Sequence, residues 1–341
     1  MRARIKSTVA APVVALIALV GAAGGCGEKS EPTEGGELEP FDLALDFFVN
    51  PDHVGIYQAL DRGYFADAGL DVRPKVPSDP SAPIKQVAAG QVDLAISYEP
   101  EVLLARDEGL EVVAVGALVQ EPLTSLISLG DAGIRSVDDL DGKTIATAGI
   151  PYQTAFLKAI LERRGLSPDD VEQVDVGLNL LPAVLSGRAD AMLGGFKNVE
   201  GVDLRLRGKD PRVVPVDRLG IPTYDELVLV ASEERVAEDP EAIRLFIAAL
   251  ERGTRDAVQE PEAATEALLD AAPDLDPRLT DAEVRATLPV LQAEEGEPYG
   301  FMTPEQWQRF AGFMADEGLI DALPEAEEVL TNELLPGQPS K

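Results

Sequence analysis

The sequence predicts a two-lobed α/β protein, and three observations support this fold class. Short apolar runs alternate with helical patterns over residues 43–119. The same alternation begins again after residue 122 and continues to residue 231. From Asp239 onward, apolar residues recur at helical spacing instead. Because strands that alternate with helices indicate a parallel, doubly wound sheet, two such units and a helical end indicate two lobes.

The first unit is divided by glycines that end its expected helices. Gly63, Gly90 and Gly109 each follow a helical pattern, and glycine is the residue that most often ends a helix. The run at 43–49 contains Asp46 but is otherwise apolar, which is consistent with a buried strand. The expected strands are 43–49, 70–76, 94–97 and 112–119, and the expected helices are 53–62, 83–89 and 101–108.

The second unit repeats this arrangement with shorter elements. Ser136 is placed to cap a helical turn, and Ser186 with Gly187 closes a later helix. The expected strands are 126–129, 144–147, 171–176, 191–193, 213–216 and 227–231. The expected helices are 136–140, 153–164 and 180–185, followed by 242–257, 263–269, 281–291 and 304–317.

The sequence pattern of residues 1–25 predicts a secretory signal peptide. Arg2, Arg4 and Lys6 form a positive region, and an apolar stretch at 9–21 is too short to span a bilayer comfortably. Residues 26–40 are polar and rich in Gly, Pro and Glu, so they cannot bury apolar area and are expected to form a flexible tether.

Cys26 follows the small residues that end the signal, and its position resembles a bacterial lipobox. The match has Ala23 where leucine is usual. A lipidated Cys26 would hold the protein at a membrane face through its acyl chains. The alternative is an incidental small residue near the cleavage site. Cys26 is the only cysteine, so no disulfide can form within the chain.

Composition excludes several kinds of function. Asp and Glu number 61 against 29 Lys and Arg, and a formal charge of −32 repels nucleic acid and anionic lipid heads. The simplest role of that charge is solubility. One histidine and one cysteine cannot build a usual zinc site, so no metal is expected. The sequence has no phosphate-cradling Walker A loop.

Three segments of the chain are distinctive: 46–57 (DFFVNPDHVGIY), 194–200 (GGFKNVE) and 220–229 (GIPTYDELVL). Together they resemble one family, the thiamine-pyrimidine (NMT1/THI5-like) group of periplasmic-binding-protein-like proteins, although the family often has Trp where Phe47 stands. The segments at 89–100 and 122–145 occur in many binding proteins, including those for sulfonates and nitrate.

The resemblance implies a type II periplasmic-binding-protein-like fold with a ligand cleft between two hinged lobes. Residues 41–121 and 225–335 would form lobe 1, and residues 122–224 would form lobe 2. Closure would be a hinge motion around the ligand.

The resemblance also implies a function. The chain would be an exported, lipid-anchored solute-binding protein at the outer face of the cell membrane or in the periplasm. It would be a monomer that works with an ABC permease and its ATPase. Its ligand would be an aminopyrimidine, a thiamine precursor such as formylaminopyrimidine or hydroxymethylpyrimidine. Riboflavin-type and sulfonate or nitrate ligands are the alternatives, and a sensor role without transport stays open.

Candidate ligand-binding residues follow strand ends in both units, where α/β sheets bind ligands. Aromatic rings can stack on a heterocycle, and carboxylates can accept from an exocyclic amine. Structural roles remain open as alternatives to ligand binding. Asp46 could cap the turn, His53 could bond the main chain, Tyr57 could belong to the core, and Asn198 could stabilise a turn. Trp307 is expected to pack within a helix bundle. The candidates are Asp46, Asn50, His53, Tyr57, Ser97, Tyr98, Glu99, Phe196, Asn198, Glu200 and Tyr224.

An enzyme of the same family is the rival that must be weighed. The eukaryotic pyrimidine synthase that this family includes uses a lysine that binds pyridoxal phosphate, a histidine and a cysteine cluster. At the aligned places this chain has Ser97 and Glu101, and no cysteine lies near Leu227. A Schiff base needs an amine, which serine cannot supply. We therefore expect no cofactor and no enzymatic activity.

Overall fold

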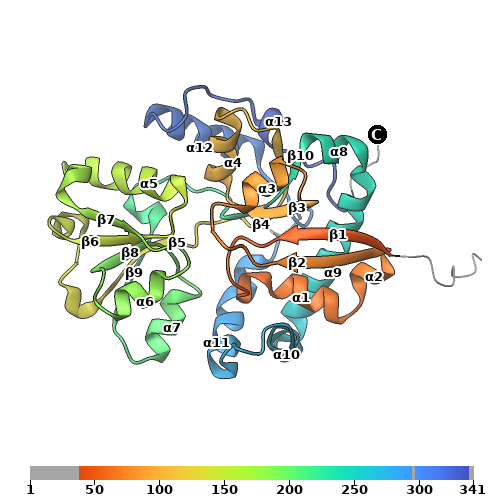
Figure 1. Cartoon of the computed structure of the whole chain (residues 1–341), viewed down its shortest axis with the longest axis horizontal. Helices are drawn as coiled ribbons and strands as arrows, with labels where there is room; N and C mark the ends of the chain where they lie inside the picture. Colours follow the sequence, from red (N-terminus) through yellow and green to blue (C-terminus); the bar gives the residue numbers. More distant parts are fainter. Residues whose placement is uncertain (1–37, 294–295, 338–341) are drawn as a thin grey trace, which may run out of the picture. The chain divides into compact units, whose positions relative to one another are not determined.

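The computed structural model describes residues 38–293 and 296–337 (Figure 1). The expected signal peptide, Cys26 and the tether up to residue 37 lie outside the described residues. The fold contains two five-stranded sheets. The first contains β1 (Glu39–Ala44), β2 (Leu70–Lys75), β3 (Leu94–Ser97), β4 (Val112–Val119) and β10 (Leu227–Ser232). The second contains β5 (Thr124–Leu129), β6 (Thr144–Thr147), β7 (Glu172–Asp175), β8 (Ala191–Phe196) and β9 (Pro211–Pro215).

Both sheets are mixed, which corrects the expectation of purely parallel sheets. The first has the order β2-β1-β3-β10-β4, and β10 runs antiparallel to both of its neighbours. The second has the order β7-β6-β8-β5-β9, and β5 runs antiparallel to β8 and β9. In each sheet the reversed strand is the one that enters from the other sheet. The side chains of β5 and β10 are buried almost throughout, so the hydrophobic pattern of these strands does not indicate their direction in the sheet.

The two crossovers between the sheets lie next to each other. The chain leaves the first sheet after β4 and returns to it at β10. The register pairs Leu227, the first residue of β10, with Val119, the last residue of β4. The outgoing and returning segments therefore begin and end at the same point of the first sheet.

Helices cover both faces of each sheet (Figure 1). In the second sheet α5 lies on one face, and α6 and α7 lie on the other. In the first sheet α3 and α4 lie on one face, and α1, α2 and α9 lie on the other. The helices up to residue 219 are η1 (Pro51–His53), α1 (Val54–Asp61), α2 (Tyr64–Asp67), α3 (Pro83–Ala88), α4 (Glu99–Asp107), η2 (Gly130–Ala132), η3 (Val137–Leu140), α5 (Pro151–Glu162), η4 (Pro168–Asp170), α6 (Leu180–Leu185), α7 (Glu200–Leu206) and η5 (Val216–Leu219).

After β10 the chain is helical, as the spacing of apolar residues predicts. It ends back at the first sheet, where Leu330 forms a parallel bridge with Ala114 and the side chain of Asn332 bonds the backbone of Met302. Within the described residues, no helix combines the length and the apolar character needed to cross a membrane. These helices are α8 (Glu233–Glu238), α9 (Pro240–Gln259), α10 (Pro261–Ala271), α11 (Pro277–Thr287), η6 (Leu288–Leu291), α12 (Pro304–Asp316) and α13 (Ala326–Val329).

The first strand differs most from the expectation. It begins at Glu39, inside the segment expected to be a tether, and pairs with β2 from its first residue. It ends at Ala44, whereas the apolar run continues to Val49. The backbone N–H of Leu45 still donates to Lys75 at 2.9 Å, and beyond it the carboxylate of Asp46 bonds His53 and Tyr98. Residues 45–49 consequently form a loop at the end of the sheet.

Helices α1 and α9 approach closely because glycines face each other at their contact. Gly253 of α9 lies against Gly55 and Ala59 of α1. A Cβ at position 253 would come within 2.7 Å of the backbone nitrogen of Ala59. Backbone atoms cannot move aside as a flexible side chain can, so this contact needs a residue without a Cβ.

Gly253→Ala is expected to lower the free energy of unfolding by about 1–3 kcal/mol through overpacking between α1 and α9. Gly312→Ala is the matched control, because a Cβ at this α12 position would meet nothing within 4 Å. This control should be neutral or stabilising by about 0.5–1 kcal/mol, since alanine favours a helix. Urea unfolding of both variants measures the difference, and equal effects would contradict the packing argument.

Candidate functional site

A cavity of about 340 Å³ opens where the ends of both sheets meet. Its walls come from the loop after β1, the start of α4, helix α11 and, in the second unit, the starts of α5, α6 and α7 with β8. It is the kind of site that α/β proteins form at the ends of their strands. The lining residues are Asp46, Phe47, Phe48, Val49, Asn50, Pro51, Tyr98, Ala148, Ile150, Tyr152, Gln153, Leu178, Asn179, Leu180, Leu181, Pro182, Gly194, Phe196, Val199, Glu200, Leu275, Leu279 and Glu283.

Asp46 is a fixed acceptor in the cavity wall. Its Oδ1 lies 2.8 Å from Nε2 of His53, and its Oδ2 accepts from the hydroxyl of Tyr98 at 2.9 Å. The Asp46 side chain is 2% exposed, so its charge is stabilised mainly by these two donors. Burial and the nearby Asp46 carboxylate raise the pKa of Tyr98 well above its usual value, which keeps its hydroxyl protonated and donating.

The hydrogen bonds of His53 define its tautomer. The backbone N–H of Asn50 donates to Nδ1 of His53 at 3.3 Å, so that nitrogen carries no proton. The proton is therefore on Nε2, which donates to Asp46. The contact is a hydrogen bond from a neutral imidazole rather than an ion pair. His53 is fully buried behind the wall and positions Asp46 without lining the cavity.

Aromatic rings form much of the cavity surface. Tyr98 directly precedes α4 in the first unit, Tyr152 lies in α5 of the second, and their ring centroids lie 5.3 Å apart at 51°. Phe47 and Phe48 meet edge to face in the loop after β1, and Phe48 is half exposed at the cavity. With Phe196 on β8, these rings give a planar ligand several faces on which to stack.

The second unit brings its own carboxylate to the cavity. Glu200 begins α7 and accepts from the backbone N–H of Phe196 at 2.7 Å. Burial is the main cause that raises the pKa of Glu200 to about 6. Gly194 has a left-handed φ of 118°, and a Cβ there would overlap the amide of Gln153. A glycine at this position therefore lets Gln153 reach the cavity wall.

The cavity is acidic. Asp46, Glu200 and Glu283 all line it, whereas none of its described lining residues is Lys, Arg or His. Such a wall repels anionic ligands and favours amines and N–H donors, because each carboxylate can only accept when ionised. Among residues 38–293 and 296–337, no group of three or more His, Cys, Asp or Glu is arranged to bind a metal ion.

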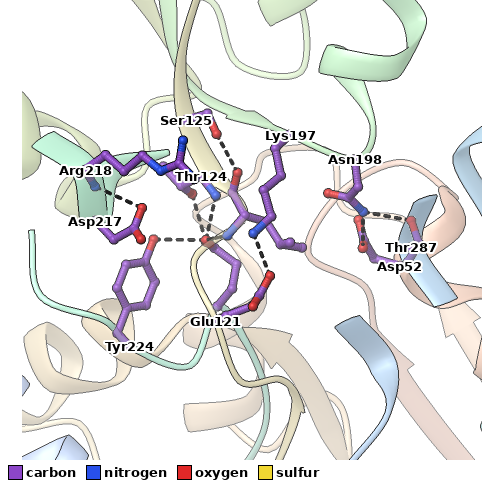
Figure 2. A network of polar contacts seen from close by, with 12 residues as sticks. Asp52, Glu121, Thr124, Ser125, Lys197, Asn198, Asp217, Arg218, Tyr224 and Thr287 are labelled. Atoms are coloured by element: carbon purple, nitrogen blue, oxygen red, sulfur yellow. Dashed lines mark hydrogen bonds and ion pairs between the residues drawn. The ribbon is translucent and has the colours of Figure 1, made fainter. Parts of the chain in front are cut away.

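Asn198 links the second unit to the first behind the cavity (Figure 2). Its Nδ2 donates to Asp52 at 2.8 Å and to Thr287 at 2.7 Å. Asn198 is 4% exposed, Asp52 3% and Thr287 fully buried. Burial raises the pKa of Asp52 to about 8, so this carboxyl is largely neutral at pH 7. The three side chains therefore form a dry contact across the cleft.

A buried carboxylate ties the two crossovers together. Oε2 of Glu226 accepts from the backbone N–H groups of Leu123 and Thr124, both at 2.7 Å, and from the hydroxyl of Tyr224 at 3.0 Å. Its Oε1 accepts from Oγ1 of Thr124 at 2.8 Å. Figure 2 shows Thr124, Ser125 and Tyr224 around this point. The outgoing and returning segments thus share one acceptor group.

The neighbouring Asp225 extends the same connection toward the C-terminal helices. Its carboxylate accepts from the indole N–H of Trp307 at 2.7 Å and from Gln306 at 3.2 Å. Its backbone N–H donates to Glu99 at 2.6 Å. Burial raises the pKa of Asp225 to about 7. Glu99 therefore supports the crossover from inside the protein.

The structure divides the candidate residues into two groups, and their ligand roles stay predictions. Five line the cavity: Asp46, Asn50, Tyr98, Phe196 and Glu200. Six do not line it and contact other residues behind its wall or at the crossovers: His53, Tyr57, Ser97, Glu99, Asn198 and Tyr224. Ser97, for instance, is fully buried and donates to Glu101. Trp307 is fully buried, and its indole is bonded as described.

Other lining residues were not among the candidates. Tyr152 and Gln153 lie in the first turn of α5, where an Ile-Pro pair before them was the only available signal of a helix start facing the cleft. Leu180 and Leu181 are the first two residues of α6, so they too lie in the first turn of a helix at the cavity. Glu283 lies in the middle of α11, and an isolated acidic residue in a helix gives no sign that it faces a cavity.

Comparison with known proteins agrees with this architecture. The structure is similar to that of the alkanesulfonate-binding protein SsuA of Xanthomonas axonopodis pv. citri, with a TM-score of 0.68 and 16% identity over 87% of this chain and 99% of that one. The two sheets, their crossovers and the cavity between them define a protein of the type II periplasmic-binding-protein fold.

The sequence comparisons identify the family. Residues 50–264 match the family described as NMT1/THI5 like. The formylaminopyrimidine-binding protein of Halalkalibacterium halodurans is 34% identical over 299 residues, covering 86% of this chain and 90% of that protein. The 4-amino-5-hydroxymethyl-2-methylpyrimidine phosphate synthase of Schizosaccharomyces pombe is 29% identical over 223 residues, covering 62% and 64%. The chain belongs to the NMT1/THI5-like family.

Glu226→Gln is expected to lower the free energy of unfolding by about 2–4 kcal/mol. The amide replaces one of two acceptor oxygens with a donor and confronts the N–H groups of Leu123 and Thr124. Glu121→Gln is the control, because the exposed Glu121 only pairs with Lys197 and should change stability by less than about 0.5 kcal/mol. Urea unfolding distinguishes them, and a stable Glu226→Gln protein would show that the carboxylate is dispensable.

Proposed function

We propose that this chain is an extracytoplasmic solute-binding protein that captures a small aminopyrimidine, a thiamine precursor, for an ABC importer. One observation carries the proposal: the cavity combines aromatic faces with three carboxyl groups and contains no basic lining residue. A flat aminopyrimidine offers a ring for Tyr98, Tyr152 and Phe196 and N–H groups for the carboxylates. The name of the Halalkalibacterium halodurans relative supports the same ligand class.

The acidic wall argues against the sulfonate and nitrate alternatives. An anionic ligand needs cationic or N–H donors, and desolvating it beside the carboxylates of Asp46 and Glu200 would be unfavourable. The likeness to the alkanesulfonate-binding protein concerns the fold, which different ligand sites share. Riboflavin stays an alternative on size, because a cavity of about 340 Å³ lies within the range of pockets that hold drug-sized ligands.

Two features argue against the synthase reaction: the residue at the position of the synthase lysine and the lack of basic residues among the described residues of the cavity wall. Ser97 stands at the position aligned with the lysine of the synthase. It is buried and donates to Glu101, so this position has no amine for a Schiff base. A phosphorylated ligand would also meet no basic group at the cavity wall. We therefore favour binding without catalysis.

The contact between the units supports capture by closure. In this proposal, residues 41–121 and 225–335 form one lobe, residues 122–224 form the other, and the lobes turn about the segments tied by Glu226. Asn198 forms its bonds to Asp52 and Thr287 only when the lobes approach, so these bonds favour the closed form.

The mature protein is expected to bind formylaminopyrimidine or hydroxymethylpyrimidine with a Kd in the micromolar range or tighter, because ring stacking and carboxylate hydrogen bonds act together. Isothermal titration calorimetry with both pyrimidines, riboflavin and taurine measures this preference. Taurine should show no binding, since the cavity wall has no positive group. Tight binding of taurine without binding of either pyrimidine would reject the proposed ligand class.

We also propose that the protein is exported and anchored by a lipid on Cys26. The support is the signal-like order of charged, apolar and small residues before this cysteine. A polar stretch follows it and ends close to Glu39, where the first strand begins. An anchor at Cys26 would keep the ligand cavity near a permease while the lobes remain free to move.

Cys26→Ser is expected to move the protein from the membrane fraction to the soluble fraction, because serine cannot form the thioether that carries the lipid. Fractionation of cells followed by immunoblotting measures the distribution. Ser30→Ala in the following polar stretch is the control and should leave the protein with the membranes. A Cys26→Ser protein that stays membrane-bound would contradict lipid anchoring at this residue.

A further inference from the structure

Glu283 is a buried carboxyl group with no partner of its own. It lies on α11, lines the cavity and is 7% exposed. Among the described residues it forms no hydrogen bond and no ion pair within 4 Å, whereas the other two lining carboxylates both accept bonds from protein donors. A buried polar group without a partner is costly, so its presence at a cavity points to a partner that arrives from outside.

Glu200 faces Glu283 from the other side of the cleft. Helix α7, which carries Glu200, packs against α11. Burial is the main cause that raises the pKa of Glu283 to about 9, and the charges of Glu200, Asp203 and Asp52 contribute to this rise. The charge of Arg207 acts in the opposite direction. The pKa of Glu200 is raised only to about 6, so Glu200 is largely ionised at neutral pH. Glu283, with its higher pKa, is protonated at the same pH.

We propose that Glu283 is a specificity-determining residue that, opposite Glu200, binds the amino group of the ligand between the two lobes. This inference rests on the proposed function and deepens it, because it assigns the class of ligand group: a primary amine, which has the two N–H donors that two carboxyl groups need. The N–H groups replace the proton on Glu283, so capture releases a proton from the protein. Bridging Glu200 and Glu283 also joins one carboxyl group of each lobe.

The unpartnered carboxyl has a cost in the free protein, and the sign of that cost can be tested. The pKa of Glu283 is about 9 when folded and near 4.5 when unfolded. A raised pKa means that the unfolded chain loses this proton first, so the group lowers folding stability progressively as the pH rises from about 4.5 to about 9. Glutamine has the same size and cannot ionise, so Glu283→Gln removes this cost.

The binding test compares Glu283→Gln with Glu266→Gln, an exposed control on the neighbouring α10. Calorimetry at pH 7.5 uses 4-amino-5-hydroxymethyl-2-methylpyrimidine and its analogue without the 4-amino group. Glu283→Gln should weaken binding of the amino compound about 10- to 100-fold, the loss of one charge-assisted bond, and should change binding of the analogue little. Titrations in two buffers of different ionisation enthalpy should show proton release by wild type and Glu266→Gln that Glu283→Gln lacks.

Thermal unfolding of the ligand-free proteins provides a second measurement. Glu283→Gln should raise Tm by about 2 °C at pH 8 and have little effect at pH 4.5, while Glu266→Gln should not depend on pH in this way. A lowered Tm at pH 8 would mean that Glu283 has a structural partner, and the inference would fail. Unchanged binding of the amino compound by Glu283→Gln would overturn it while the proposed function stands. If wild type binds no aminopyrimidine, the proposed function fails and the inference fails with it.

Discussion

The arrangement of the two lobes depends on one buried carboxylate. Glu226 accepts four hydrogen bonds and fixes Leu123 and Thr124, which leave the first sheet, against the segment that returns to it. Each lobe has its own five-stranded sheet, so the geometry of the cleft is decided where the chain crosses between them. A charged acceptor is suited to this position, because it satisfies several backbone and hydroxyl donors at once in a place that water does not reach. In the closure we propose, the lobes would rotate about this point while the bonds at the crossovers stay formed.

The polarity of the cleft follows from which groups the fold satisfies and which it leaves open. Asp46 accepts from His53 and Tyr98. Glu200, the first residue of α7, accepts from the backbone N–H of Phe196 at the end of β8. Both are therefore positioned before any ligand arrives. Glu283 has no such donor within residues 38–293 and 296–337, and in the proposed site its proton is the one that the ligand replaces. Aromatic side chains from both lobes line the cavity beside these groups and lower the local polarity, which strengthens polar interactions there. Fixed acceptors and one exchangeable proton are what the proposed nitrogen-rich ligand would need.

The sequence predicted the regular elements better than their directions or the full site. Strands at 94–97, 112–119 and 144–147 have the predicted bounds, because apolar runs between turn residues are distinctive. The reversal of β10 was not predictable, since a strand buried on both faces looks the same in either direction. Residues that directly follow strand ends, such as Asp46 and Tyr98, do lie at the cavity. Glu283 was missed because a helix reaches the cavity only through tertiary packing, which no local pattern records.

Trp307 has a consequence for how this protein can be observed. It is the single tryptophan of the chain, and its indole N–H donates to Asp225, which lies between Tyr224 and Glu226. The ring is fully buried among the C-terminal helices, yet its one polar atom is bonded to the returning crossover. Indole emission depends on the electric field and the hydrogen bond at that nitrogen. The molecule therefore contains a built-in optical reporter of its hinge, which signals without a dye and without a label in the cleft.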